Sequence, residues 1–281
     1  MKTFKKAAAF MLAAMTVLSL AACQGGQEKT SGSESTGSTA GTAAETSVDK
    51  IKADGYVTMA TNAEFEPFEF KDGNEFKGID VEIANKIAEK LGVKLEIHDI
   101  AFDTTIAELQ SGKANFVAAG MTADEDRKKN VDFSETYFNA SQAIIVANDS
   151  SITKPADLSG KKVGVQQGTT GDKYCTNEDG TNEVSGIEVQ RYNKGVDAVT
   201  DLISGRVDAV VIDNFPASRF VEKNSDKIKK LDEALTIEEY AIAVPKGDKE
   251  MLSVINEVLA ELKDSGELDK LVDKYKSALE G

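Results

Sequence analysis

The 281-residue sequence has no tryptophan, two cysteines, one histidine and four prolines. Cys23, Cys175 and His98 are therefore the only thiol and imidazole groups, so a zinc site has almost no ligands to draw on. We expect no metal site and no cofactor. Because Cys23 is expected to be modified, as argued below, Cys175 would have no partner and no internal disulfide is expected.

Basic residues are also scarce, with 33 Lys and Arg against 48 Asp and Glu and a formal net charge of −15. Removing the three lysines of residues 1–22 leaves 30 basic residues against 48 acidic ones, a net charge of −18. No basic stripe interrupts this acidic composition. The composition therefore disfavours nucleic acid as a partner.

The N-terminus has the pattern of an export signal. Three lysines precede an apolar segment at residues 7–20 that is too short to span a bilayer. The following Leu20-Ala-Ala-Cys23 resembles a bacterial lipobox, in which the cysteine is lipidated and becomes the first residue of the mature chain. We therefore predict a signal peptide at residues 1–22 and a lipid anchor on Cys23, which would hold the protein outside the cytoplasm on the bacterial cell membrane. An ordinary secretory signal followed by an incidental cysteine is the alternative.

The next segment has nothing to bury. Residues 24–47 are mostly Gly, Ser, Thr, Ala and Glu, without a large apolar side chain. We expect residues 23–49 to comprise the lipidated cysteine and a flexible linker. About 230 residues remain, enough for two modest α/β lobes or for one larger domain.

An internal repeat favours two lobes. Residues 111–120, Ser-Gly-Lys-Ala-Asn-Phe-Val-Ala-Ala-Gly, correspond to residues 204–213, Ser-Gly-Arg-Val-Asp-Ala-Val-Val-Ile-Asp. Each copy follows apolar residues on helical spacing, so each unit is predicted to be a helix, a Ser-Gly turn and a strand. Gly120 and Asp213 then end equivalent strands. Ligands of open α/β sheets bind beyond the carboxyl ends of strands, so both ends are expected to face a shared cleft.

Both units continue into segments suited to an anion. After the first strand, Thr122 can cap a helix and offer a hydroxyl group, and the planar guanidinium of Arg127 matches a carboxylate. A solvated surface arginine is the alternative. In the second unit, a Gly-Thr turn at residues 168–170 provides backbone amides before a helix. A phosphate loop is the competing interpretation, but no Gly-Lys-Ser/Thr follows.

Several segments resemble, in order and spacing, the polar amino-acid family of periplasmic-type solute-binding proteins (bacterial extracellular solute-binding protein family 3). The resemblance runs from about Tyr56 to the C-terminus. It is carried by Ala60-Thr-Asn-Ala-Glu-Phe-Glu-Pro-Phe-Glu-Phe70, Gly78-Ile-Asp-Val-Glu82, Ala119-Gly-Met-Thr122 through Arg127, Val131-Asp-Phe-Ser134 and Val210-Val-Ile-Asp213.

The resemblance implies a fold and a function. The fold would be the type II periplasmic binding protein fold, with two α/β lobes joined by two hinge crossings. Lobe 1 would comprise residues 50–138 plus 241–281, and lobe 2 residues 139–240. The protein would be a monomer that encloses a free L-amino acid between its closing lobes and delivers it to the permease of an ABC importer, without catalysing a reaction.

The resemblance also assigns the backbone groups of the amino acid. Arg127 would bind the α-carboxylate, helped by the backbone amides of Thr122 and Thr170. Asp213, the Gly120 carbonyl and the Thr122 hydroxyl would bind the α-ammonium. Thr170 falls where some relatives have glycine, a departure that should be harmless if its backbone amide is the donor.

The ligand side chain would lie between Phe65 and Phe102, for which core packing is the alternative role. Asn62, Gln166 and Glu239 would meet its tip. The position of Asn62 is often an aspartate in relatives, which leaves the ligand's charge open. Two neutral amides favour a polar, uncharged amino acid such as glutamine, and a basic one comes second, with Glu239 as its partner.

Two other classes of function are compatible with the sequence. A periplasmic enzyme of the same fold, similar to a dehydratase, would need an acid in the cleft with a raised pKa, for which Glu64, Glu66 and Glu239 are the candidates. Surface carboxylates are the alternative interpretation of all three. An amino-acid sensor domain of a receptor is the third possibility.

The lipobox gives the first testable prediction. Cys23→Ser should leave the folded part intact but release it from the cell envelope, because the acyl chains would be lost. Fractionation of cells that express each form measures this, with the unchanged chain as control. A Cys23→Ser protein that stays in the membrane fraction would contradict the prediction.

Overall fold

The computed structural model describes residues 46–178, 180 and 182–277. The expected signal peptide, Cys23 and most of the expected linker lie outside these residues. The first helix, α1 (Ser47–Asp54), begins inside the segment 23–49 that we expected to be linker. A capping box explains this earlier start: the Thr46 hydroxyl accepts from the Asp49 amide, and the Asp49 carboxylate accepts from the Thr46 amide.

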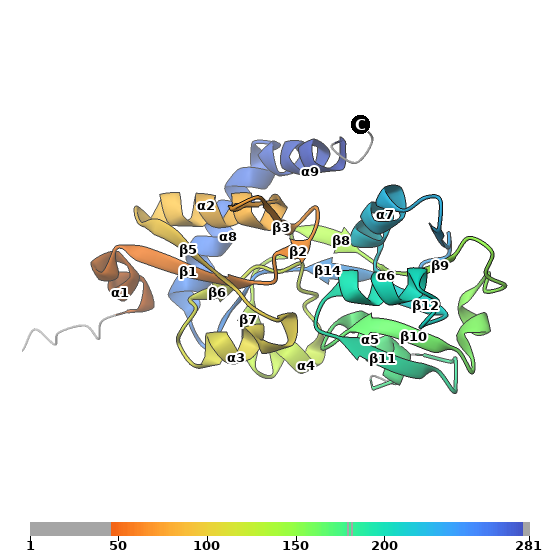
Figure 1. Ribbon diagram of the computed structural model, residues 1–281. Helices are drawn as coiled ribbons and strands as arrows, with labels where there is room; N and C mark the ends of the chain where they lie inside the picture. Colours follow the sequence, from red (N-terminus) through yellow and green to blue (C-terminus); the bar gives the residue numbers. More distant parts are fainter. Residues whose placement is uncertain (1–45, 179, 181, 278–281) are drawn as a thin grey trace, which may run out of the picture. The chain divides into compact units, whose positions relative to one another are not determined.

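Two five-stranded sheets form the framework (Figure 1). In the first sheet, β1 runs parallel to β5 and β6, while β15 is antiparallel to β6 and β7. Its order is β5 (Lys94–Asp99), β1 (Tyr56–Thr61), β6 (Phe116–Val117), β15 (Ala243–Pro245) and β7 (Val131–Phe133).

The second sheet repeats this plan. Strand β10 runs parallel to β11 and β12, while β9 is antiparallel to β12 and β13. Its order is β11 (Glu188–Tyr192), β10 (Lys162–Gln166), β12 (Ala209–Asp213), β9 (Gln142–Ala147) and β13 (Ile228–Lys230). The repeated strands of the sequence are β6 and β12, which occupy equivalent places, so the expected α/β fold class is confirmed.

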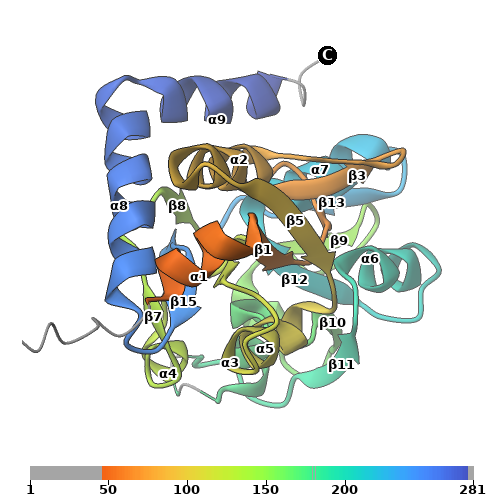
Figure 2. The same ribbon diagram turned by 90° about the vertical axis from the view of Figure 1, so that its left-hand side faces the viewer.

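Helices cover each sheet. Helices α1, α2 (Ile79–Leu91), α3 (Thr105–Gln110) and α4 (Glu125–Lys128) pack against the first sheet, and a 3-10 turn at Phe102–Thr104 precedes α3. Helices α8 (Lys249–Asp264) and α9 (Glu267–Ser277) pack against α2 and against each other. With the second sheet pack α5 (Thr170–Thr176), α6 (Gly195–Ile203) and α7 (Asn214–Lys223), and a 3-10 turn lies at Pro155–Leu158. Figure 2 shows α9 beside α2, a pair that is in contact. Among the described residues, no helix is long and apolar enough to cross a bilayer.

The α2 helix illustrates why these segments are helical. Its apolar residues recur at intervals of three and four, so that Ile79, Ile83 and Ile87 are fully buried on one face. Gly92 ends the helix in the left-handed conformation, with φ of +74°. The buried face packs against the long helix α8.

Two small ladders complete the fold. Strands β8 (Phe138–Ala140) and β14 (Glu238–Tyr240) pair antiparallel where the chain passes from one sheet to the other and back. The lobe boundaries that we predict, at 138/139 and 240/241, fall in and next to this ladder. A second ladder of β2 (Glu64–Phe65), β3 (Glu69–Asp72) and β4 (Glu75–Lys77) follows β1.

Gly78→Ala should destabilise the protein strongly. Gly78 has φ of +125°, and an added Cβ would lie 2.1 Å from the Phe68 carbonyl oxygen. The backbone would have to move, so we expect a loss of roughly 2 to 4 kcal/mol in the free energy of unfolding.

Gly73→Ala is the matched control. Gly73 has φ of +63°, but nothing lies within 4 Å of an added Cβ, so the loss should be only about 1 kcal/mol. Chemical denaturation of both variants measures the difference. Equal losses would show that the contact with Phe68 is not the cause.

Candidate functional site

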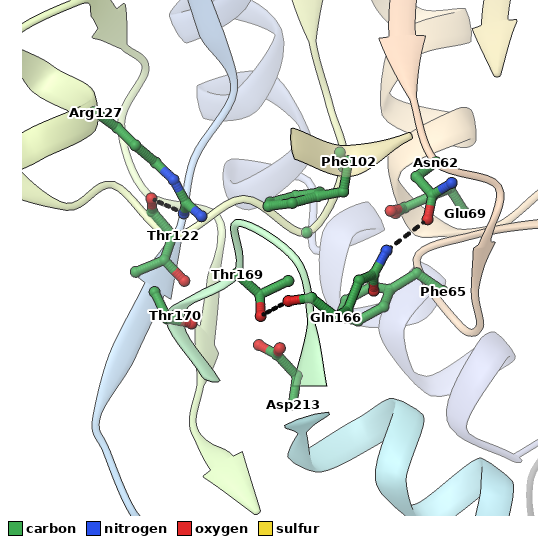
Figure 3. A pocket seen from close by; sticks show the side chains of 12 residues that line it. Asn62, Phe65, Glu69, Phe102, Thr122, Arg127, Gln166, Thr169, Thr170 and Asp213 are labelled. Carbon is green, nitrogen blue, oxygen red and sulfur yellow. Dashed lines mark hydrogen bonds between the residues drawn. The ribbon is translucent and has the colours of Figure 1, made fainter. Parts of the chain in front are cut away.

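A small cavity lies where the ends of the two sheets face each other (Figure 3). Nine of the ten ligand-binding residues predicted from the sequence line it, and Glu239 does not. The lining residues are Asn62, Phe65, Glu69, Phe102, Ala119, Gly120, Thr122, Arg127, Gln166, Thr169, Thr170 and Asp213.

One end of the cavity holds a buried cation. Arg127 lies in the short helix α4 and is only 6% exposed. Its guanidinium donates to the Thr122 carbonyl at 2.8 Å and to the Gly168 carbonyl at 3.0 Å. The guanidinium carbon lies over the Phe102 ring, 5.3 Å from the ring centroid. Burial lowers the pKa of Arg127, and the Asp124 carboxylate opposes this shift. The arrangement suits an incoming carboxylate, because a buried guanidinium gains most from an anionic partner.

An acid lies at the end of β12, in the middle of the cavity. Asp213 is 5% exposed and accepts a hydrogen bond from the Tyr240 hydroxyl. Burial raises the pKa of Asp213 to about 7, and the nearby Glu238 carboxylate adds to this shift. A buried carboxyl group of this kind is stabilised in its ionised form by an ammonium group.

Gly120 brings the first sheet's loop close to the cavity. It has φ of +51°, and an added Cβ would lie 2.6 Å from the Phe65 ring, so only glycine fits. Its amide donates to Asp80 at 2.8 Å, and the Tyr137 hydroxyl donates to the same buried carboxyl group at 2.6 Å. Strand β6 ends at Val117, so Gly120 lies three residues beyond the strand that we expected it to end.

The far end of the cavity contains amides and aromatic rings. The Gln166 amide group donates to Asn62 at 2.9 Å, and the Asn62 amide group donates to the Ile100 carbonyl at 2.9 Å. The first bond joins the second sheet to the first, and the second fixes Asn62 to the loop after β5 of its own sheet. Phe65 is 8% exposed and Phe102 is partly buried, so both rings serve as walls of the cavity while also packing on neighbouring apolar residues.

Three lining residues are absent from the set predicted from the sequence, namely Ala119, Thr169 and Glu69, and Glu69 is the charged one. It begins β3, is 1% exposed, and its Oε2 has no hydrogen-bond partner among the described residues. Burial raises its pKa well above the usual range, and the neighbouring Asp80 and Asp213 raise it further. Its position between Phe68 and Phe70 gave no signal of burial, because a charged residue between two apolar ones is also the pattern of a strand with one face in solvent.

Glu239 is placed outside the cavity. Side chains alternate along β14, so Glu238 and Tyr240 are buried while Glu239 is exposed. The other two acids considered for an enzyme are also outside it, because Glu64 pairs with Lys194 and Glu66 pairs with Arg219. Among the residues that the structure covers, no group of His, Cys, Asp and Glu is arranged to hold a metal ion.

These features define a class of protein. The model of the bacterial extracellular solute-binding proteins, family 3, matches residues 57–278, and the chain belongs to this family. It is an amino-acid-binding protein of the kind that serves ABC importers, and it has the two-lobed α/β fold that the sequence predicted.

Individual relatives are named for several amino acids. The chain is 35% identical to the arginine-binding extracellular protein ArtP of Bacillus subtilis, over 77% of this chain and 84% of that protein. Holo ArgBP from T. maritima is 44% identical, with a TM-score of 0.72 and coverage of 76% and 93%. An ancestral arginine-binding protein bound to glutamine is 44% identical, with a TM-score of 0.73 and coverage of 79% and 97%. Other relatives are named for cystine and histidine.

The raised pKa of Asp213 leads to a prediction about stability and pH. Below about pH 4 the carboxyl group is protonated in the folded and in the unfolded chain. Between pH 4 and 7 only the unfolded chain loses the proton, so ionisation favours unfolding, and above pH 7 this destabilisation is complete. Asp213→Asn removes the titration while keeping an oxygen that can accept from Tyr240.

We therefore expect Asp213→Asn to stabilise the ligand-free protein more at pH 8 than at pH 4, by on the order of 3 kcal/mol. Denaturation of the two proteins at both pH values measures this, and titrating groups that do not interact with Asp213 cancel in the comparison. A gain that is the same at both pH values would mean that Asp213 is already ionised in the folded protein at pH 4.

Proposed function

We propose that this protein captures an L-amino acid with a positively charged side chain, with arginine as the first choice, for import through an ABC permease. The observation that carries the proposal is the buried Oε2 of Glu69, which lines the cavity without a partner among the described residues. Figure 3 shows Glu69 and Arg127 at opposite ends of the cavity, with Phe102 between them. This order matches an α-carboxylate at one end and a cation at the other.

In this proposal each part of the ligand meets the group that suits it. Arg127 binds the α-carboxylate, Asp213 binds the α-ammonium, and the aliphatic part of the side chain lies between Phe65 and Phe102. The distal cation then approaches Glu69. Burying a cation without a partner is expensive, so a carboxyl group at this end favours a charged ligand over an apolar one.

The surroundings of Glu69 strengthen the choice of a cation. Asp80 and Asp213 both raise its pKa, so whenever these two groups are ionised they make the potential at this end of the cavity negative. A cation placed here pairs with Glu69, which then releases its proton. A protonated Glu69 would suit only a neutral group. A neutral group would gain no charge–charge attraction from the neighbouring acids, whereas a cation would.

Glutamine, the ligand favoured by the sequence, remains the second candidate. Asn62 and Gln166 line the same end of the cavity and are neutral. A related ancestral protein has been crystallised with glutamine. However, the two amides already bond to each other at 2.9 Å, so a ligand amide would have to share or displace that bond.

The setting of the protein is also part of the proposal. We propose that Cys23 carries a lipid anchor, that residues 50–138 plus 241–281 and residues 139–240 are the two lobes, and that the protein acts as a monomer outside the cytoplasm. Named relatives are binding proteins, which supports transport over catalysis. One structural neighbour is described as an ancestral amino-acid-binding protein that preceded cyclohexadienyl dehydratase.

Comparison of L-arginine with L-citrulline, its neutral counterpart of similar shape, tests the ligand class. Calorimetry should show arginine binding at least tenfold tighter than citrulline or glutamine, a difference of about 1.4 kcal/mol or more. Glu69→Gln should reduce the preference for arginine over citrulline to less than about threefold, because the cation loses its partner. Glu75→Gln, a change at an exposed position of the same small sheet, is the control.

Glutamine binding as tightly as arginine to the unchanged protein would replace our first candidate with the second. A preference for arginine that survives in Glu69→Gln would leave the ligand class in place but remove Glu69 from its recognition.

A further inference from the structure

Behind the cavity, one buried carboxylate connects its two walls. Glu238 lies in β14, where the chain returns to the first sheet, and is 6% exposed. Its Oε2 accepts from the Thr122 hydroxyl at 2.6 Å and from the Thr170 hydroxyl at 2.9 Å. Thr122 belongs to the loop after β6, and Thr170 begins α5 beside the second sheet. A single oxygen can accept both hydroxyl protons only when the two walls are close together.

These bonds decide what the two hydroxyl groups can offer to a ligand. A hydroxyl group has one proton and two lone pairs. Since Thr122 and Thr170 give their protons to Glu238, they can only accept hydrogen bonds on the side of the cavity that they line. One lone pair of Thr170 is already used, because its oxygen accepts from the Gln142 amide at 2.9 Å.

The carboxylate is held in this role by a further contact. Its other oxygen, Oε1, accepts from the Thr236 hydroxyl at 2.7 Å. The side chain is therefore fixed from within its own segment as well as from both walls. With Asp213 lining the same cavity, the Thr122 oxygen and the Asp213 carboxyl group form a set of acceptors, which suits an ammonium group and repels a carboxylate.

We propose that Glu238 is a positioning residue for the α-ammonium group of the ligand. It sets the direction of the Thr122 and Thr170 hydroxyl groups, so that the closed walls present acceptors to the ammonium group and leave the carboxylate to Arg127. The proposal rests on the binding of an amino acid but not on the charge of its side chain. It also explains why the exposed Glu239 is not equivalent to its neighbour.

The test compares two ligands that differ only in the α-ammonium group. Calorimetry with L-arginine and with 5-guanidinopentanoate, which lacks that group, is carried out on Glu238→Ala, Glu238→Gln and the control Glu239→Gln. Glu238→Ala should weaken L-arginine at least 20-fold and the desamino ligand less than threefold, because only the ammonium group uses the oriented hydroxyls. Glu239→Gln should change neither affinity by more than about twofold.

Glu238→Gln provides the conservative rescue. Its amide oxygen can still accept both hydroxyl protons, so L-arginine should be weakened only about three- to tenfold, again with the desamino ligand unchanged. In both variants the loss for L-arginine should exceed the loss for the desamino ligand. Glu238→Gln alone can therefore test the proposal if Glu238→Ala does not fold. In a Thr122→Val background the effect of Glu238→Gln on L-arginine should shrink, because one of the two cavity-lining hydroxyl groups that residue 238 orients is already lost.

Equal losses for both ligands would overturn the proposal, since they would mean that Glu238 only holds the two walls together. Unchanged affinity for L-arginine would overturn it as well. If the unchanged protein prefers L-glutamine to L-arginine, the proposed ligand class fails, and the comparison is made with L-glutamine and 5-amino-5-oxopentanoate instead. The expected selectivity for the ammonium group is then the same.

Discussion

The Arg127 guanidinium is buried between the two sheets, and the order of groups along the cavity depends on how this charge is held. It donates to one carbonyl oxygen from each wall, those of Thr122 and Gly168, which use two of its five N–H donors. Asp124 lies 3.6 Å from its Nε. These partners make burial of the cation tolerable without supplying a bidentate carboxylate. The guanidinium is therefore desolvated and oriented before a ligand carboxylate binds. Little of the binding free energy is then spent on ordering the Arg127 side chain.

The buried acids of the site, unlike Arg127, have pKa values that burial shifts toward the neutral form. Burial raises the pKa of Asp80 to about 6 and that of Asp213 to about 7, and it raises the pKa of Glu69 well above its usual range. Near neutral pH these groups are therefore partly or wholly protonated in the absence of a cation. Attraction to an ammonium or guanidinium group offsets the free energy needed to ionise these acids, whereas a neutral group supplies no such attraction. The buried guanidinium is thus charged with or without a ligand, whereas the buried acids ionise more readily when a cation is present, which supports the cationic ligand that we propose.

The sequence predicted the framework because the framework depends on local pattern. The repeat at residues 111–120 and 204–213 corresponds to two strands at equivalent positions, and the motif around Arg127 led to its place in the cavity. One error came from register, which local pattern does not determine. In a strand a shift of one residue exchanges the faces, so Glu239 was chosen where Glu238 is buried.

Glu69 was missed for a related reason. Its burial depends on where the small sheet of β2, β3 and β4 places β3 relative to the cavity. The spacing of residues in the sequence does not predict that placement. Helix α1 was not predicted, and the segment expected to be linker overlaps its start, because residues 24–47 are rich in small polar residues and the capping box at Thr46 and Asp49 was not recognised. In each case a contact made by the folded chain overrode the composition of the segment.

Closure of the cavity cannot be attributed to the ion pairs at its rim alone. The Lys173 Nζ lies 2.6 Å from Asp124 Oδ2, and the Arg219 Nε lies 2.9 Å from Glu66 Oε1. Each of these ion pairs joins one wall of the cavity to the other. Their side chains remain about one fifth exposed, and pairs of this kind each contribute roughly 0 to 1 kcal/mol. The contacts that gain most from closure are the enclosed ones, where Arg127, Asp213 and Glu238 act in a low dielectric. In the function that we propose, a ligand that pairs with Arg127 and Asp213 would therefore favour the closed arrangement more than the rim pairs do, and the contribution of the rim pairs would vary with ionic strength.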